Sequence, residues 1–481
     1  MHSRPTLNEA RSKIVATVGP ACNSVEMLIR LVQAGVDVFR INAAHGTQTD
    51  FALILEKIRQ VREKTGFPVA VLLDLSGPKI RLGQLHTDPL DVEPGRELVF
   101  VRGETPHGPD ELTSNYEKLV DEVKVGDRIM LADGTISLEV IQRSADRFRC
   151  RVLTGGTIRS RQGINLPGVS LSVTAMRPED VSNAIWAANN EIDFVSLSFV
   201  RSPQDVCTLK DILRSLDCPA LVIAKIEKRE ALESLEAIVD AADGVMVARG
   251  DLGVEIDVAE TPIAQKRIIA VCREKLKPVI VATQMLESMH ENSRPTRAEA
   301  SDVANAILDG ADACMLSGET AIGKYPVQAV DTMDRIMRVT EQLLKDQPPA
   351  PLPKEVKRVH PITSAVTYNS SNIAQAIGAK LVVVASRSGG TAWVKSKQRN
   401  YIPTLGVSDN PATLRRMCLF WGIMPHYMAA FHSPRELIEN VVQWGRDHQV
   451  LSPGDRIVVV AGTGVVDKTH NTVIVHEVQP S

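Results

Sequence analysis

Two carboxylates and a lysine stand at the ends of two neighbouring apolar runs of the sequence. Lys225 and Glu227 end one run, and Gly250 and Asp251 follow the next. Two carboxylates, completed by water and an anionic ligand, suit Mg2+ or Mn2+, and a lysine beside that metal can neutralise a migrating phosphoryl group. Gly250 lets backbone N–H groups approach an anion. The alternative is a structural ion pair between Lys225 and Glu227.

Polar side chains also follow most of the other apolar runs. An arginine there offers a planar fork for phosphate or carboxylate, although a lone arginine or histidine in a loop is more often solvated or structural. No P-loop and no dinucleotide-binding glycine motif follows the first run, so a nucleotide, if bound, is held without them. The groups are Arg40, Asn42 and His45 after the second run, Asp74, Leu75, Lys79 and Arg81 after the third, Thr283 after the seventh, and Ser317 with Glu319 after the eighth.

Eight short apolar runs must position these groups. They cover residues 14–18, 36–41, 69–73, 194–200, 220–224, 244–248, 279–282 and 313–316, with amphipathic helical segments between them. Runs of this kind predict parallel strands buried on both faces. Since reactive side chains follow nearly every strand, the pattern favours a closed (β/α)8 TIM barrel over an open doubly wound sheet, which gathers its ligands at one switch point.

Two further segments do not follow the strand–helix alternation. Residues 84–170 contain short β patterns broken by glycine turns, which predicts an all-β insertion at the catalytic face. Such an insertion suits a lid, although a purely structural role is the alternative. A proline-rich segment, 347–353, precedes a last α/β unit. We therefore expect a barrel from residues 1–83 and 171–345, a β-barrel lid at 84–170 and a C-terminal α/β regulatory domain at 346–481.

The composition gives no sign of a nucleic-acid or membrane partner. The 481 residues carry a net charge of −3 and only 4% aromatic residues, and no run is apolar enough to span a membrane. Seven scattered cysteines and the absence of a signal sequence predict a cytoplasmic protein with reduced thiols. These residues predict a Mg2+-dependent barrel enzyme acting on a small phosphorylated anion. Aldolases, enolising enzymes and phosphoryl transferases all fit.

Longer motifs resemble those of pyruvate kinases, in the same order and over nearly the whole chain. They occupy residues 17–20, 40–42, 224–227, 246–255, 282–287, 294–305, 315–320 and 323–326; the third is Ala224-Lys225-Ile226-Glu227, and the sixth begins Arg294-Pro295-Thr296-Arg297-Ala298-Glu299.

The resemblance implies transfer of the phosphoryl group of phosphoenolpyruvate to ADP, giving pyruvate and ATP in glycolysis. Lys225 matches the lysine that stabilises the transition state, and Glu227 and Asp251 match the Mg2+ ligands. By the same matching, the residues that contact phosphoenolpyruvate are Arg40, Lys225, Gly250, Asp251 and Thr283. Those that face the nucleotide are Arg40, Asn42, His45 and Arg81. The proton that converts enolpyruvate to pyruvate is delivered with the help of Thr283, Ser317 and Glu319.

The chain departs from the family pattern where K+ binds. The family has Asn, Ser, Asp and Thr there, whereas this chain keeps Asn42 and Asp74 but has Ala44 and Leu75, and Lys79 replaces a glutamate. Members with a lysine at this position resemble a class that is independent of monovalent cations. We therefore expect the Lys79 ammonium to stand in for K+; a solvent-facing Lys79 is the alternative.

Other departures bear on the nucleotide and on regulation. Glu179 replaces a nucleotide-binding lysine and would repel phosphates. In the C-terminal unit, the loop Ser386-Arg387-Ser388-Gly389-Gly390-Thr391 could cradle the phosphate of an effector, as in the family, or be silent. The last loop, 462–468, is atypical. The resemblance also implies a homotetramer, and the rival function is a catalytically silent, effector-binding paralogue of the same fold.

Overall fold

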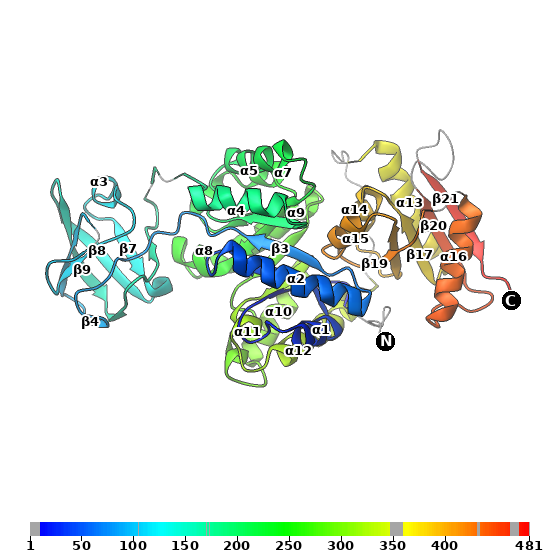
Figure 1. Cartoon of the computed structure of the whole chain (residues 1–481), viewed down its shortest axis with the longest axis horizontal. Coiled ribbons are helices and arrows are strands. Elements are labelled where there is room, and N and C mark those ends of the chain that lie inside the picture. The colour runs from blue at the N-terminus through cyan, green and yellow to red at the C-terminus, as the bar shows by residue number, and fades with distance from the viewer. Residues whose placement is uncertain are drawn as a thin grey trace.

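Three lobes lie in a row in the computed structural model of the chain (Figure 1). An all-β lobe lies at one end, a barrel in the middle and an α/β lobe at the other end. The structure describes residues 10–103, 105–169, 171–172, 174–346, 359–430, 433–461 and 471–480. The proline-rich segment 347–353 and the loop 462–468 lie outside these residues. No helix in the described part has the length and apolar character needed to cross a membrane.

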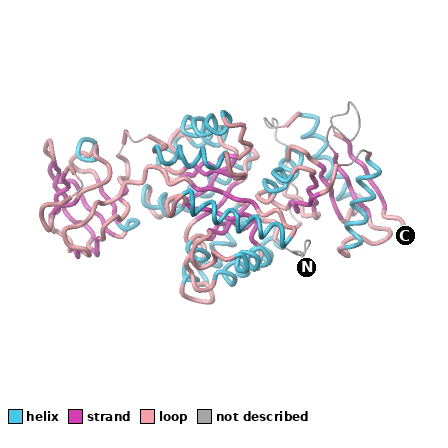
Figure 2. The backbone as a smooth tube through the Cα atoms, viewed as in Figure 1, coloured by secondary structure: helices cyan, strands magenta, loops and turns pink. Residues whose placement is uncertain are grey.

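The middle lobe is a closed barrel of parallel strands in the order β1-β16-β15-β14-β13-β12-β3-β2, which confirms the predicted (β/α)8 fold. Figure 2 shows its strands at the centre with helices around them. The strands are β1 (Lys13–Thr17), β2 (Val36–Asn42), β3 (Ala70–Asp74), β12 (Phe194–Leu197), β13 (Leu221–Ile226), β14 (Gly244–Ala248), β15 (Val279–Ala282) and β16 (Ala313–Leu316).

Helices cover the outside of this barrel, and local sequence explains where several of them begin and end. Thr296 and Glu299 form a capping box, in which each side chain accepts from the other's backbone N–H, and Gly310 ends that helix in a left-handed conformation. The helices are α1 (Val25–Ala34), α2 (Gln48–Thr65), α4 (Pro178–Ala188), α5 (Pro203–Ser215), α6 (Arg229–Glu233), α7 (Leu235–Ala241), α8 (Arg249–Glu255), α9 (Thr261–Glu274), η2 (Glu287–His290), α10 (Arg297–Asp309), α11 (Gly318–Ala321) and α12 (Pro326–Leu344).

The all-β lobe is inserted between β3 and α4 and has a core of its own. A six-stranded sheet runs in the order β11-β7-β8-β9-β5-β6, and β10 pairs with β4. Phe100 and Phe148 stack in its core with ring centroids 4.8 Å apart. Its elements are β4 (Leu90–Val92), β5 (Glu97–Val101), β6 (Glu111–Leu112), α3 (Leu119–Glu122), β7 (Arg128–Leu131), η1 (Ala132–Gly134), β8 (Ile136–Arg143), β9 (Arg147–Thr154), β10 (Gly156–Ile158) and β11 (Ile164–Asn165).

The C-terminal lobe is a five-stranded sheet in the order β19-β18-β17-β20-β21, in which β21 alone is antiparallel. Edge strand β19 contains Pro425, which an edge tolerates because half of its backbone groups face away from the sheet. The elements are α13 (Pro361–Ala376), β17 (Leu381–Ala385), α14 (Gly390–Lys397), β18 (Thr404–Ser408), α15 (Pro411–Met417), β19 (Ile423–Tyr427), α16 (Pro434–Asp447), β20 (Arg456–Ala461) and β21 (Thr472–Glu477).

Helix α14 buries the amino group of Lys395, which has no carboxylate partner in the described part of the chain. Lys395 is 3% exposed, and its Nζ donates to Ser371 Oγ of α13 at 2.6 Å. Burial lowers the pKa of Lys395 from its usual 10.5 to about 7. Above about pH 7, the folded protein therefore holds this lysine in its neutral form. In the unfolded chain the same group is protonated up to about pH 10.

We expect the stability of the C-terminal lobe to rise between about pH 7 and pH 10, since the unfolded chain binds the extra proton there. Replacing the lysine by an apolar side chain, Lys395→Met, removes the contribution of Lys395 to this dependence and leaves that of Lys397, whose pKa burial lowers to about 8. At pH 7 the Lys395→Met variant should raise the free energy of unfolding of the lobe by several kcal/mol at most, because a shift of one pKa unit corresponds to about 1.4 kcal/mol. Thermal unfolding across this pH range measures the effect, with the exposed Lys380→Met as control; an unchanged pH slope in Lys395→Met would contradict it.

Candidate active site

The carboxyl ends of all eight parallel strands meet at one mouth of the barrel, on the side from which the β lobe emerges. This arrangement brings together residues that are far apart in the sequence. Arg40 lies near the end of β2, Asp74 ends β3, and Lys225 lies near the end of β13. Glu227, Asp251, Thr283 and Ser317 follow β13, β14, β15 and β16 directly or within three residues.

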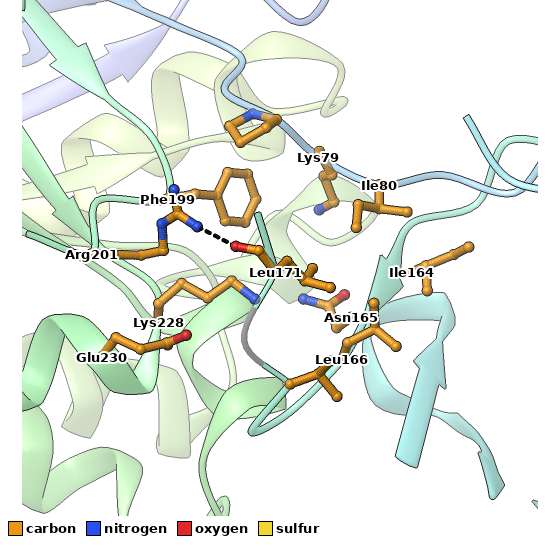
Figure 3. A pocket seen from close by; sticks show the side chains of 12 residues that line it. Lys79, Ile80, Ile164, Asn165, Leu166, Leu171, Phe199, Arg201, Lys228 and Glu230 are labelled. Atoms are coloured by element: carbon orange, nitrogen blue, oxygen red, sulfur yellow. Dashed lines mark hydrogen bonds between the residues drawn. The ribbon is translucent and has the colours of Figure 1, made fainter. Parts of the chain in front are cut away.

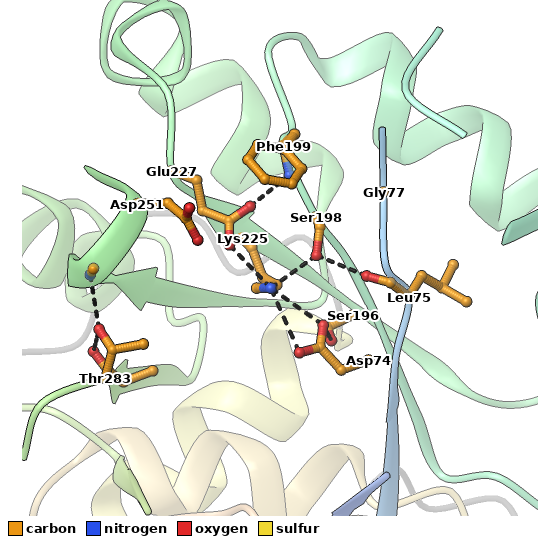
Figure 4. A network of polar contacts seen from close by, with 12 residues as sticks. Asp74, Leu75, Gly77, Ser196, Ser198, Phe199, Lys225, Glu227, Asp251 and Thr283 are labelled. Atoms are coloured by element: carbon orange, nitrogen blue, oxygen red, sulfur yellow. Dashed lines mark hydrogen bonds and ion pairs between the residues drawn. The ribbon is translucent and has the colours of Figure 1, made fainter. Parts of the chain in front are cut away.

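Lys225 is the centre of the polar network in Figure 4. Its Nζ lies 2.9 Å from Glu227 Oε1, 2.8 Å from Ser198 Oγ and 3.4 Å from Asp74 Oδ1. Burial alone lowers the pKa of Lys225, but the carboxylates of Asp74 and Glu227 outweigh it, and the pKa is raised. The site therefore holds a fixed, buried positive charge.

Asp74 is locked on its other side by Arg40. Arg40 Nε and Nη2 both donate to Asp74 Oδ2, at 2.8 and 2.5 Å, and Ser196 Oγ donates to Oδ1 at 2.6 Å. Burial raises the pKa of Asp74, but Lys225 and Arg40 together lower it below its usual value. Arg40 Nη1 also donates to Thr17 Oγ1 at 3.0 Å, so most of its donors are in place before any ligand binds.

Glu227 and Asp251 form a pair of carboxylates beside Lys225. Glu227 is 1% exposed, and its Oε2 accepts from the backbone N–H of Phe199 at 2.6 Å. Burial and the charge of Asp251 raise the pKa of Glu227, against the opposing effect of Lys225. No group of three or more His, Cys, Asp or Glu in the described residues could hold a metal ion. Two carboxylates still fit Mg2+ or Mn2+, which keep water and substrate oxygens as their other ligands.

Lys79 lies against Asp251. Its Nζ donates to Asp251 Oδ1 at 3.0 Å, and the two side chains are 26% and 22% exposed. Ala44 has no hydroxyl, and Leu75 offers only its carbonyl oxygen, which accepts from Ser198 Oγ at 2.7 Å. The lysine thus pairs with Asp251, a carboxylate of the expected metal site, and not with the Asn42 or Asp74 side chain of the expected K+ site.

Thr283 adopts a backbone conformation that is rare for a β-branched residue, with φ of +69°. The next residue, Gln284, also has a positive φ of +54°. Hydrogen bonds hold this turn: Gly250 N–H donates to Thr283 Oγ1 at 2.8 Å, and Arg249 Nη2 donates to the Thr283 carbonyl oxygen at 2.7 Å. The strained turn therefore joins Gly250 and Thr283 at adjacent strand ends.

Three expected nucleotide contacts lie at the rim of this cluster. Asn42 is paired with Asp74 in the strand register, and its Oδ1 accepts from Ala44 N–H at 3.2 Å. His45 is exposed. Arg81 Nη1 donates to the Arg161 carbonyl oxygen in the β lobe, at 3.1 Å.

Glu179 lies in the first turn of α4, where a carboxylate is favourable. Its carboxylate is 76% exposed and lies 3.6 Å from Arg177 Nη2. Part of the negative charge expected to repel phosphates is therefore offset by a neighbouring arginine.

A pocket opens between the mouth and the β lobe (Figure 3). Ile164 and Leu166 line it from the β lobe and its exit, and Phe199 from the barrel. Arg201 Nη1 donates to the Leu171 carbonyl oxygen across it, at 2.9 Å. The inserted lobe thus covers one side of the mouth with apolar surface.

The candidate effector loop lies in the other lobe, after β17. Gly389 has a φ of +87°, and its N–H donates to Ser386 Oγ at 3.1 Å, while Gly390 N–H donates to Ser388 Oγ at 3.5 Å. Thr391 is buried in the first turn of α14, and the guanidinium of Arg387 pairs with Asp409 at 3.1 Å. The hydroxyls expected to cradle a phosphate are thus bonded to the loop's own backbone.

Ser196 and Ser198 are members of the network that sequence reasoning missed. They alternate along the end of β12 and its continuation, so both hydroxyls point to the same side, toward Asp74 and Lys225. This period of two was visible in the sequence, but the predicted strand 194–200 treated both residues as ordinary strand positions. The strand in fact ends at Leu197, because Phe199 turns to a φ of +55°.

The fold and the site define a barrel enzyme with a buried lysine and paired carboxylates, an arrangement suited to phosphoryl transfer. The family described as pyruvate kinase, barrel domain, matches residues 9–330, and pyruvate kinase, alpha/beta domain, matches residues 364–476. The chain belongs to the pyruvate kinase family and is a phosphotransferase.

Individual pyruvate kinases are similar over nearly the whole chain. The one from Mycobacterium intracellulare is 41% identical over 97% of this chain and 98% of its own length. That from Geobacillus stearothermophilus is 39% identical over 95% of this chain and 78% of its own length. The crystal structure of a pyruvate kinase from Cryptosporidium parvum matches with a TM-score of 0.88 at 31% identity, covering 98% of this chain and 96% of that one.

Replacing Gly77 by alanine tests the close packing of its backbone against Ser198 and Phe199. Gly77 has a φ of +65°, and an added Cβ would lie 2.8 Å from Ser198 Cβ and 2.9 Å from Phe199 Cδ2. Gly66 has nearly the same φ, +69°, with nothing within 4 Å of such a Cβ. We expect Gly66→Ala to lower the free energy of unfolding by about 1 kcal/mol, through backbone strain alone. Gly77→Ala should lower it by ~1–3 kcal/mol more, because the added Cβ collides with Ser198 and Phe199. Unfolding in urea compares the two; equal losses would contradict the contact.

Proposed function

We propose that the protein transfers the phosphoryl group of phosphoenolpyruvate to ADP, giving pyruvate and ATP, as a step of glycolysis. The observation that carries the proposal is the buried Lys225 ammonium, held by Glu227 and Asp74 at the mouth of the barrel. A fixed cation in a site of low dielectric stabilises the charge on a phosphoryl group in transit without reorganising. Family membership supports the same reaction.

Neighbouring groups would bind and orient the substrates. Arg40, fixed by Asp74 and Thr17, presents its guanidinium edge to the phosphate. Gly250 and the Thr283 turn, joined by a hydrogen bond, would form a surface for the carboxylate of phosphoenolpyruvate. Asn42, His45 and Arg81, at the rim, would face ADP. The β lobe would close over both substrates and exclude water, so that the phosphoryl group passes to ADP and not to solvent.

Glu227 and Asp251 would hold Mg2+ or Mn2+. When bound, such an ion would supply positive charge that neutralises the anionic oxygens of the substrates. The hydrogen bond from Phe199 N–H fixes Glu227 for this purpose.

The last step protonates the enolate of pyruvate at C3. Thr283, Ser317 and Glu319 would deliver this proton, since Thr283 and Ser317 follow adjacent strands β15 and β16. Glu319 is 1% exposed, and burial raises its pKa, which favours the protonated acid as a donor.

A coupled assay that detects pyruvate, with phosphoenolpyruvate, ADP and Mg2+, tests the reaction. We expect Lys225→Met to lower the turnover number by a factor of about 10²–10³, because the charge that stabilises the transition state is lost. Lys64→Met, near the end of α2 and away from the mouth, is the matched control and should keep full activity. If the parent protein forms no pyruvate in the presence of Mg2+, the proposal fails and a catalytically silent paralogue is favoured.

We also propose that the enzyme does not require K+. Asp74 already pairs with Arg40 and Lys225, while Ala44 and Leu75 contribute no side-chain oxygen. The Lys79 ammonium, bonded to Asp251, supplies a further built-in positive charge at the mouth. Coulomb repulsion from these three cations opposes the binding of a free monovalent ion.

A charge reversal at Lys79 tests this proposal. Lys79→Glu should lower activity at least about 10-fold without K+, since it removes a fixed charge worth a kcal/mol or more near the site, and adding KCl should restore part of it. Steady-state rates with and without KCl, in buffers free of other monovalent cations, measure the effect; Lys64→Glu is the control. Strong activation of the parent enzyme by KCl would count against the proposal.

Family membership supports three further proposals about the whole protein. We infer a homotetramer, a cytoplasmic location that suits seven free cysteines, and a phosphorylated effector at residues 386–391. Rates measured with a panel of sugar phosphates and nucleotides would detect such an effector.

A further inference from the structure

His290 lies behind the candidate proton donor Glu319, and its side chain has no assigned role. Its Nε2 is buried without a hydrogen-bond partner among the described residues. This nitrogen is 4.0 Å from Glu319 Oε2, while Nδ1 is 4.0 Å from Glu287 Oε1 on the outer side. The imidazole is 24% exposed and Glu287 is 55% exposed. The ring therefore lies between solvent and a buried acid.

Two backbone N–H groups hold the Glu319 carboxylate, and His290 lies beside it. Its Oε1 accepts from Leu286 N–H at 3.0 Å, in the turn that begins at Thr283, and its Oε2 accepts from Ser317 N–H at 2.7 Å. Among the ion pairs of the described residues, His290 is the basic side chain that reaches this carboxylate. A buried acid that gives up a proton in each turnover needs a route by which the proton returns.

Gly318 gives the imidazole room to approach. A Cβ at this position would lie 2.2 Å from His290 Cε1 and 2.3 Å from Nε2, so only glycine allows the ring to lie there. Closing the gap of 4.0 Å to a hydrogen bond needs a movement of about 1 Å. A small ring rotation over Gly318 supplies this movement.

We propose that His290 is a relay residue that returns protons from solvent to Glu319 during the conversion of enolpyruvate to pyruvate. The inference rests on the proposed function and deepens it. In the relay, C3 of the enolate forms its C–H bond with the proton of the Glu319 acid, passed on by a hydroxyl at the mouth, and C2–O becomes the carbonyl. Nδ1 of the neutral imidazole, in its Nε2–H form, takes a proton from hydronium in solvent. The imidazolium then gives its Nε2 proton to the Glu319 carboxylate, and exchange of the Nδ1 proton with water restores the Nε2–H form. The net reaction consumes one proton from solvent.

His290 acts through Glu319, so its test must separate proton transfer from phosphoryl transfer. Exchange of the C3 protons of pyruvate in D2O, followed by NMR with enzyme and Mg2+, reports proton transfer alone. Quenched single turnovers with phosphoenolpyruvate and ADP report ATP formation. His290→Phe keeps a ring against Gly318 but lacks both nitrogens, and His86→Phe, at an exposed position of the β lobe, is the matched control.

We expect His290→Phe to slow C3 exchange about 10–100-fold, to keep the single-turnover rate of ATP formation, and to regain exchange when imidazole is added. Exchange as fast as in the parent, no rescue by imidazole, or an equal loss of ATP formation would each overturn the relay. His290→Gln replaces the phenylalanine variant if the latter does not fold. A parent enzyme that forms no ATP overturns the proposed function, and the relay with it; an active parent with normal exchange in His290→Phe overturns the relay alone.

Discussion

The burial of one ammonium group, Lys225, is the constraint on which the site depends. A charge removed from water is tolerated only with well-placed partners, and losing one partner of a buried pair costs about 3–5 kcal/mol. Asp74 and Glu227 are those partners. Each is held in turn, Asp74 by Arg40 and Ser196 and Glu227 by Phe199 N–H. The carboxyl ends of β2, β3, β12 and β13 are therefore tied into one network, so the geometry of the site depends on that of the barrel.

Local backbone strain completes this network. Phe199 and Thr283 both have positive φ values, +55° and +69°, which cost of order 1–3 kcal/mol each for residues of their size. In each case the strained conformation places a group for a hydrogen bond within the site. The N–H of Phe199 donates to Glu227, and Oγ1 of Thr283 accepts from Gly250 N–H. The closed barrel supplies the rigidity that keeps these conformations, since the strand before each turn is fixed on both sides by its neighbours.

The sequence predicts the barrel better than it predicts the contacts within the site. Continuous apolar runs locate all eight strands because burial on both faces leaves a strong signal. Edge strand β19 gives a weaker signal because Pro425 and His426 interrupt its apolar run. Within the site, spacing along the chain says which strand end carries Lys79 but not which carboxylate it meets. Its pairing with Asp251 depends on the path of the chain into the β lobe, which no local pattern encodes.

The ion pairs that join the two outer lobes to the barrel differ in how deeply they are buried. At the C-terminal lobe, Lys397 and Arg415 reach the buried Asp312 and Asp193 at the amino ends of β16 and β12, and the side chains in these pairs are at most 12% exposed. Separating the C-terminal lobe from the barrel would leave these buried charges without partners, which is energetically costly. This interface therefore resists opening. At the mouth, the ion pair of Lys79 with Asp251 links the entrance of the β lobe to the barrel. Both side chains are more than 20% exposed, so water can replace either partner at less cost. Ion pairing therefore opposes movement of the β lobe less than it opposes movement of the C-terminal lobe.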